Sequence, residues 1–365
     1  MNEAFTDTDI FGEFPAEEAP AARLAPPPPA EPLDEAAVAA ALVRMGAVGS
    51  NERPRGRRIE GGISSEIWLI DVPGRRLCLK RALPQLKLTQ LWQAPTNRNR
   101  HEFAWFRVAG RIAPDAAPRL VGQDSAAGLF VMEYLDPAMY PVWKHQLRDG
   151  NADPATAAAV ASRLALIHNR TAGDPEIARM FATDEAFYAL RIEPYLIAPT
   201  RWHPDLAGPL GRLAHALAGT RLALVHGDVS PKNILVGRRG PVFQDAECAW
   251  YGDPAFDLAF VLNHLLLKCL WNPRAVSRFL ACFNQLAESY LAAVQWEPRE
   301  DIEKRTARLL PALTLARIDG KSPVEYVTSE LDKGRARRFA RAMLNDPADR
   351  LHVVREAWAA ARVGM

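Results

Sequence analysis

The sequence has few cysteines, and their spacing excludes one class of protein at once. Its 365 residues hold four cysteines, and no two of them form a Cys-x-x-Cys pair. This excludes a disulfide framework. All four lie in apolar segments, so we expect buried, reduced thiols in a cytoplasmic protein: Cys78, Cys248, Cys269 and Cys282.

Long hydrophobic runs are also missing. The longest apolar stretch, residues 258–271, is interrupted by Asn263, His264 and Lys268, and it is too short to cross a bilayer. The acidic N-terminal segment has no basic region followed by an apolar one, so no signal peptide is expected. We therefore expect no membrane association.

Neither sign of charge dominates the chain as a whole, but charge is unevenly placed. The net charge is +2, yet residues 1–35 contain nine acids and one arginine, which leaves a net charge of about +10 for the rest. A basic body suits a small polyanion such as a nucleotide. No Lys/Arg stripe with interleaved aromatics indicates nucleic acid. We therefore expect an anionic small ligand and no nucleic-acid partner.

The order of predicted elements indicates an α+β fold. Residues 1–33 are acidic and proline-rich and cannot bury enough apolar surface to fold, so a disordered tail is expected. A small β-rich part, 34–135, precedes a larger helical part, 136–365. The expected elements are a helix at 34–45, strands at 57–60, 66–71, 76–80 and 129–133, a helix at 97–109 ended by Gly110, and helices from Asp153 onward, apart from a strand, loop and hairpin at 222–246.

The most informative segment contains a predicted hairpin, residues 234–236 and 241–244. Antiparallel pairing returns Asp245 to the end of the hairpin where Asn233 begins, and Asp228 lies on the entering loop. Two carboxylates and an amide oxygen therefore converge, and these are ligands that Mg²⁺ prefers. We expect Asn233 and Asp245 to hold Mg²⁺ and Asp228 to act as the base that accepts a hydroxyl proton during phosphoryl transfer.

This pattern resembles that of a known family. The motif His-Gly-Asp-x-x-x-x-Asn at 226–233, followed twelve residues later by Asp245, resembles the catalytic and metal-binding loops of the aminoglycoside phosphotransferase and choline kinase-like family. Residues 251–259, Tyr-Gly-Asp-Pro-Ala-Phe-Asp-Leu-Ala, resemble the segment that follows in the same family. The resemblance implies a bilobal protein-kinase-like fold and a kinase that uses ATP to phosphorylate a hydroxyl of a small molecule.

The same resemblance implies an ATP clamp in the first part of the chain. If Asp71 pairs with Arg76 across a Pro-Gly turn, Lys80 falls opposite Ile67, on the face that would cover the nucleotide. Lys80 is one of only eight lysines, and Glu102 resembles the helix glutamate that pairs with this lysine in kinases. The other residues expected to contact ATP are Gly61, Gly62, Ser64 and Ser65 in the phosphate-covering loop, and Glu133 and Leu135 at the hinge.

Several nearby residues have more than one interpretation. Glu247 is expected to meet a second Mg²⁺; the alternatives are that it supports the metal ligands from behind or lies on the surface. Asp257 is interpreted as a structural brace for the catalytic loop, and His226 as a packed, hydrogen-bonded histidine. Lys232 contacts phosphate or substrate in one interpretation and is a solvated loop lysine in the favoured one.

The acceptor is not identified by the sequence. The arginine-rich C-terminal half argues against a polycationic acceptor and favours a sugar, a nucleoside-like molecule or an anion. Asn233 and residues 245–247 are interpreted as a departure from methylthioribose kinases, which share the overall plan, and so argue against that substrate. A protein-directed kinase and a non-catalytic nucleotide-binding partner protein are the two alternatives.

Overall fold

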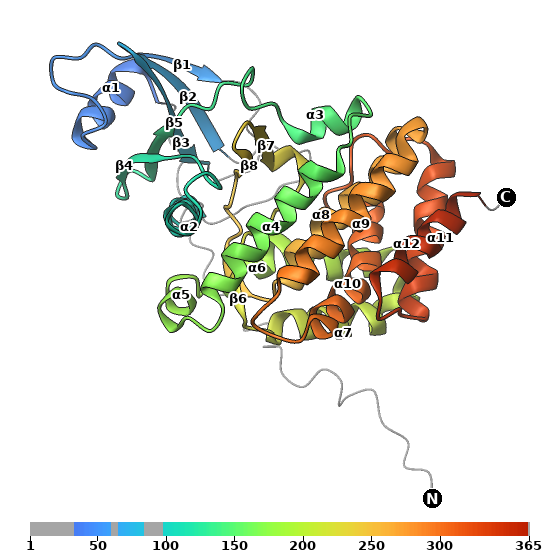
Figure 1. Ribbon diagram of the computed structural model, residues 1–365. Helices are drawn as coiled ribbons and strands as arrows, with labels where there is room; N and C mark the ends of the chain where they lie inside the picture. Colours follow the sequence, from blue (N-terminus) through green and yellow to red (C-terminus); the bar gives the residue numbers. More distant parts are fainter. Residues whose placement is uncertain (1–32, 60–64, 84–97, 364–365) are drawn as a thin grey trace, which may run out of the picture. The chain divides into compact units, whose positions relative to one another are not determined.

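The computed structural model describes residues 33–59, 65–83 and 98–363 (Figure 1). From Leu33 onward the chain forms one compact unit. Residues 1–32, on which the predicted tail falls, lie outside the described residues. The expected boundary between lobes at 135/136 falls between a strand and a helix and stays a prediction.

A five-stranded antiparallel sheet forms the first part of this unit. Its order is β1-β2-β3-β5-β4, which confirms the predicted β-rich segment. The strands are β1 (Arg55–Ile59), β2 (Ser65–Val72), β3 (Arg75–Ala82), β4 (Leu120–Asp124) and β5 (Leu129–Glu133). The sequence did not predict β4.

The register of β2 and β3 is the predicted one. Asp71 lies opposite Arg76, and Ile67 lies opposite Lys80, because the chain reverses at Gly74 with a left-handed φ of 76°. Alternation then divides the strands into two faces. Cys78 and Lys80 lie on one face, and their neighbours Leu77 and Leu79 lie on the other.

Each face of the sheet packs against a different helix. Helix α1 (Glu35–Arg44) begins where predicted, with Asp34 as its N-cap: the Asp34 carboxylate accepts a bond of 2.7 Å from the N–H of Ala37. Its apolar side packs with Trp68 and Leu79. Helix α2 (Arg98–Ile112) packs in the core that includes Cys78. It runs past Gly110, contrary to the prediction, because glycine adopts helical angles and Pro114 comes only later.

Helices make up most of the second part, as predicted (Figure 1). Helix α4 packs against α9, and α8 lies against both α9 and α10. Helix α4 begins at Pro154, as expected, and the side chain of Asp153 caps it by accepting a bond from the N–H of Ala155. The helices are α3 (Trp143–Arg148), α4 (Pro154–Thr171), α5 (Pro175–Met180), α6 (Asp184–Phe187), α7 (Ala207–Gly219), α8 (Ala255–Trp271), α9 (Val276–Ala293), α10 (Arg299–Asp319), α11 (Glu330–Asn345) and α12 (Leu351–Val363), with a π-helical segment η2 (Tyr188–Ile197).

Two short antiparallel pairs interrupt the helices. Strand β6 (Ala223–Val225) pairs with β9 (Trp250–Gly252), and the predicted hairpin is formed by β7 (Ile234–Gly237) and β8 (Gly240–Phe243). A short 3-10 turn, η5 (Pro231–Asn233), leads into β7. This part of the chain therefore holds the loop segments on which the candidate site residues lie.

Two further expectations concern cysteines and membranes. All four cysteines are free and buried, as predicted. Within the described ranges, every helix is too short or too polar to cross a membrane.

Candidate functional site

The loop after β6 is held in place by a buried carboxylate. Asp257, on α8, is fully buried and accepts bonds from the backbone N–H groups of His226 at 2.7 Å and Gly227 at 2.8 Å. Two buried donors are thus satisfied by one side chain. This is the predicted bracing role, and it fixes the backbone that carries Asp228.

Gly227 and His226 shape the same loop. Gly227 has a φ of 79°, and a Cβ there would lie 2.4 Å from the carbonyl oxygen of Cys248, so only glycine fits. His226 accepts a bond from the Asp228 N–H at Nδ1, while its Nε2 lies 3.1 Å from the carbonyl of Gln244. Burial lowers the pKa of His226, in keeping with a neutral, packed histidine that is not itself a base.

The Asp228 carboxylate lies among hydrogen-bond donors. Asn233 Nδ2 donates to its Oδ2 at 2.9 Å, and the cationic groups of Arg191 and Lys232 each lie 3.3 Å from the same oxygen. Burial raises the pKa of Asp228, but Lys232 and Arg191 outweigh it, so the net shift is downward. Asp228 is therefore an ionised carboxylate at neutral pH.

Asp245 follows β8 and lies beside Asn233, as the hairpin predicts. The N–H of Gln244 donates to the carbonyl of Asn233 at 2.8 Å, which brings the two ends of the hairpin together. Asp245 has a left-handed φ of 64° and is the one non-glycine residue with positive φ among those described. Strained backbone of this kind gathers at functional positions, where surrounding contacts hold it. Lys232 Nζ lies 3.9 Å from Asp245 and 3.3 Å from Asp228, so one lysine contacts both acids.

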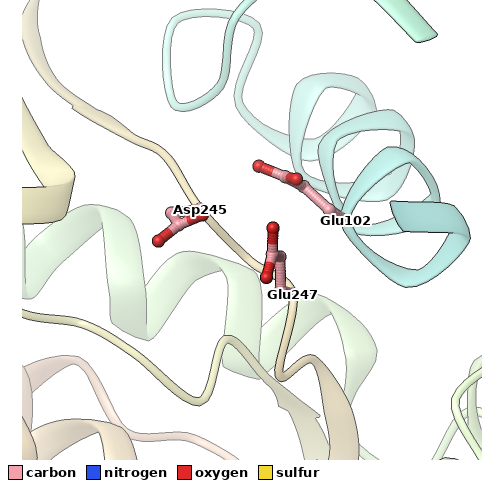
Figure 2. A group of neighbouring side chains, drawn as sticks. All are labelled: Glu102, Asp245 and Glu247. Carbon is pink, nitrogen blue, oxygen red and sulfur yellow. The ribbon is translucent and has the colours of Figure 1, made fainter. Parts of the chain in front are cut away.

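Three acids, Glu102, Asp245 and Glu247, lie close together in an acidic cluster (Figure 2) and surround the ammonium of Lys80. Its Nζ lies 2.7 Å from Glu102, 2.7 Å from Asp245 and 3.2 Å from Glu247, and oxygens of these three acids lie within 4.8 Å of one another. The predicted pairing of Lys80 with Glu102 is therefore present. Strand β3, helix α2 and the loop after β8 meet at this ammonium.

Electrostatics inside the cluster follow from burial and from Lys80. Burial disfavours the ammonium, but Asp245, Glu102 and Glu247 outweigh it and raise the pKa of Lys80 well above its ordinary value. Burial raises the pKa of Glu102 to about 8 although Lys80 opposes it. For Asp245 the burial effect is outweighed by Lys80 and Lys232, so its pKa is lowered. Lys80 and Asp245 are thus a charged pair, whereas burial favours the protonated form of the Glu102 carboxyl.

Glu247 is engaged on both of its oxygens. Ser65 Oγ donates to one at 2.6 Å and Arg98 Nε to the other at 2.9 Å, and Arg98 is fully buried. These partners, together with Lys80, favour the supporting interpretation of Glu247 over direct contact with a second metal ion. Ser65, expected to contact ATP, is thereby attached to the acidic cluster.

The remaining predicted ATP residues are only partly described. Gly61, Gly62 and Ser64 lie outside the described residues. Glu133 ends β5, and its carboxylate accepts a bond of 2.9 Å from the N–H of Arg119. Leu135 follows two residues later, in the stretch that leads to α3.

The donor set near Asp245 fits a magnesium ion. Asp245 is partly exposed, with its side chain 30% accessible, and Asn233 uses its Nδ2 toward Asp228, which leaves the amide oxygen to bind a cation. A carboxylate and an amide oxygen suit Mg²⁺, which keeps waters and phosphate oxygens as its other ligands. These contacts favour Asp245 and Asn233 over Glu247 as ligands of Mg²⁺.

Sequence reasoning missed two arginines of the site. Arg191, on η2, also donates from Nε to the carbonyl of Gly227, and no motif around it points to this role. Arg98 lies four residues before Glu102 on α2, a spacing that places both on one helix face, so this signal was available. Lys232 was favoured as a solvated loop lysine; it is half exposed but pairs with Asp228.

Comparison with known proteins assigns the family. The family model described as the phosphotransferase enzyme family matches residues 55–268, more than half of the chain. The chain therefore belongs to this family. Among curated relatives, the methylthioribose kinases of Yersinia pseudotuberculosis and Erwinia tasmaniensis are 23% and 25% identical over 241 residues, which is 57% of this chain and 58% and 59% of theirs. The chain thus matches less than two thirds of the length of these relatives.

Solved structures support the fold. A choline/ethanolamine kinase family protein from Mesorhizobium loti has a TM-score of 0.53 at 17% identity, covering 90% of this chain and 99% of that one. An ethanolamine kinase from Plasmodium vivax has a TM-score of 0.52 at 12% identity, covering 90% and 87%. These similarities confirm the expected bilobal, protein-kinase-like α+β fold. The departure of Asn233 and residues 245–247 from the metal loops of methylthioribose kinases stays a prediction.

Proposed function

We propose that the protein transfers a phosphoryl group from ATP to a hydroxyl of a small molecule. The observation that carries this proposal is the contact of Lys80 Nζ with both Glu102 and Asp245, each at 2.7 Å. This contact joins the expected nucleotide-covering strand to the expected metal ligand. Such an arrangement suits the binding of phosphate oxygens and a divalent cation next to one another.

The charged groups divide the work as follows. Asn233 and Asp245 would hold Mg²⁺, which supplies charge neutralisation for the phosphates when it is bound. Lys80 would turn from Asp245 toward phosphate oxygens, while Glu102 keeps the ammonium in position. Glu247, held by Arg98 and Ser65, supports this group from behind. Preorganised charges of this kind commonly supply most of the rate in phosphoryl transfer.

Asp228 is the proposed base. It is ionised, and it lies on a loop fixed by Asp257, so it can orient an acceptor hydroxyl and accept its proton. Arg191 and Lys232 hold its carboxylate from two sides. The expected hinge contact remains part of the proposal: among the described residues no backbone carbonyl accepts a bond from the N–H of Leu135, so this group could donate to adenine.

A small-molecule acceptor is favoured over a protein acceptor. Only nine residues lie between Asp245 and the start of α8 at Ala255, and strand β9 occupies part of that stretch. This leaves no room there for a long segment that would bind a peptide. The non-catalytic alternative is disfavoured because Lys80, Asp228, Asn233 and Asp245 are all present. We keep the cytoplasmic location as part of the proposal, since the four thiols are free.

The direct test is an ATP-consumption screen with Mg²⁺. Purified protein is assayed for ADP formation with sugars, nucleosides, amino alcohols and aminoglycosides, and hits are verified by detecting the phosphorylated product. The proposal expects acceptor-dependent ADP formation that requires Mg²⁺. ADP formation that never depends on any acceptor, or nucleotide binding with no transfer to any of them, contradicts it.

A further inference from the structure

A group of basic side chains from three helices of the second part of the chain has no role in the proposed mechanism. We call Lys144, His264, Lys268 and Arg317 the basic cluster; they come from α3, α8 and α10. Lys268 Nζ lies 4.1 Å from the ring centre of Trp271, and Lys144 Nζ lies 6.0 Å from the same ring. His264, Lys268 and Arg317 are all nine-tenths buried or more.

The basic cluster is continuous with the proposed catalytic base. Arg191, which contacts Asp228, lies over the rings of Tyr195 and Phe260, each at 5.8 Å. Phe260 contacts the His264 ring at 5.3 Å. On the other side, the hydroxyl of Tyr195 accepts a bond of 3.3 Å from Arg317. Two layers of side chains, Arg191 and then Tyr195 with Phe260, therefore connect Asp228 to the basic cluster.

Negative charge is scarce around the basic cluster. Of the ion pairs recorded for the described residues, one involves this cluster, between Lys144 and Glu325, and the Glu325 side chain is 64% exposed. Lys268 has aromatic faces as partners, since Tyr326 lies 3.7 Å from its Nζ. Burial, together with Lys144 and Arg317, lowers the pKa of Lys268 to about 6, although Glu325 opposes the shift.

Among the described residues, several buried polar atoms in and beside the basic cluster have no hydrogen-bond partner. In the described part of the chain, His264 Nε2, Arg317 Nε, Asn263 Nδ2 and the Tyr326 hydroxyl are buried and have no hydrogen-bond partner. Native proteins leave few such groups unpaired, and a bound ligand is one reason for them. Three of these atoms are hydrogen-bond donors and fit the oxygens of an anion.

We propose that the basic cluster binds a carboxylate or phosphate group of the acceptor, so that the substrate is a hydroxylated small-molecule anion. That the bound anion is the acceptor rests on the proposed function. Binding of an anion at the basic cluster does not depend on that function. An anion shared between Lys144 and Arg317 would offset the mutual repulsion of these two cations and would favour the protonated form of Lys268 beside them. It would also distinguish this protein from kinases of cationic acceptors, which need acidic pockets.

The test uses small probes that differ in charge and not in length. Glycolate, ethylene glycol and ethanolamine each carry a hydroxyl on two carbons, with charges of −1, 0 and +1, and inorganic phosphate represents the phosphate source. Binding to the full chain is measured by ligand-observed NMR without nucleotide. We expect glycolate or phosphate to bind at least tenfold more tightly than ethylene glycol or ethanolamine, and the stronger of the two identifies the anionic group.

Variants locate the binding. Lys268→Met is expected to weaken the binding of the anion at least tenfold, whereas Lys304→Met, which removes an exposed lysine paired with Asp349, leaves it unchanged. Lys80→Met separates the two anion sites, because an anion at the basic cluster is retained in this variant and one at the nucleotide site is lost. Circular dichroism checks that each variant is folded.

The outcomes are distinct. No anion binding at tens of millimolar, tighter binding of ethanolamine than of glycolate, or anion binding unaffected by Lys268→Met overturns the inference while leaving the phosphotransferase proposal intact. If anions bind at Lys268 but the ATP-consumption screen shows no transfer, the inference stands as anion binding and the proposed function fails.

Discussion

Replacing Lys268 by methionine is expected to stabilise the protein by an amount that depends on pH. The lysine is only 1% exposed, and its Nζ lies against the rings of Trp271 and Tyr326, which stack on each other. Methionine preserves a long, unbranched side chain there and removes the charge. The packing should therefore remain while the cost of burying an amine near Lys144 and Arg317 disappears.

The magnitude follows from the pKa of the buried amine. Its pKa is 10.5 ordinarily and about 6 in the folded protein. Between pH 10.5 and pH 6, the Lys268 amine is protonated in the unfolded chain and neutral in the folded protein. The free energy of unfolding of the wild type therefore decreases as the pH falls from 10.5 toward 6. Each pH unit is worth about 1.4 kcal/mol, which gives an advantage for the methionine variant of about 3 kcal/mol at pH 8 and about 5 kcal/mol at pH 7.

The assay is urea unfolding followed by tryptophan fluorescence at pH 7, 8 and 9. The difference in unfolding free energy between wild type and Lys268→Met should grow as the pH decreases. The exposed control Lys304→Met should show a small difference that does not change with pH. A difference that is flat across the range, or a methionine variant less stable than wild type, would refute the reasoning about this buried amine.

Two other substitutions test the site and its loop. Lys80→Met is expected to lower turnover by about 10²-fold or more, because it removes the ammonium that neutralises phosphate charge; a loss in ADP formation below threefold would contradict this role. Gly227→Ala is expected to lower stability by about 2 kcal/mol or more, since its Cβ would meet the Cys248 carbonyl. The control Gly211→Ala has open space around its Cβ and should gain about 0.5–1 kcal/mol. Thermal unfolding of both variants shows whether Gly227→Ala lowers stability through local strain, because the same substitution at Gly211 introduces no strain.

Much of the fold could be predicted because local chemistry determines it. The Pro-Gly turn fixes the pairing of Asp71 with Arg76, and this pairing places Lys80 opposite Ile67. In the same way, the turn between β7 and β8 returns Asp245 to Asn233. These predictions needed only strand alternation and turn geometry.

Other features depend on contacts between distant segments and could not be predicted. Arg191 reaches Asp228 only because η2 packs against the loop after β6, and no local pattern encodes that packing. Strand β9 has three residues and gains its partner, β6, from tertiary structure. The end of α2 was predicted wrongly because Gly110 weakens a helix without ending it.

The central claim, that Asp228 accepts the proton of an acceptor hydroxyl, is tested most directly by single-turnover phosphoryl transfer in Asp228→Asn. With the best acceptor from the screen, we expect the transfer rate to fall by about 10²–10⁴-fold, while the affinity for Mg-ATP stays within about threefold. The substitution keeps the shape of the side chain and removes its ability to take a proton. Transfer at close to the wild-type rate would contradict the account.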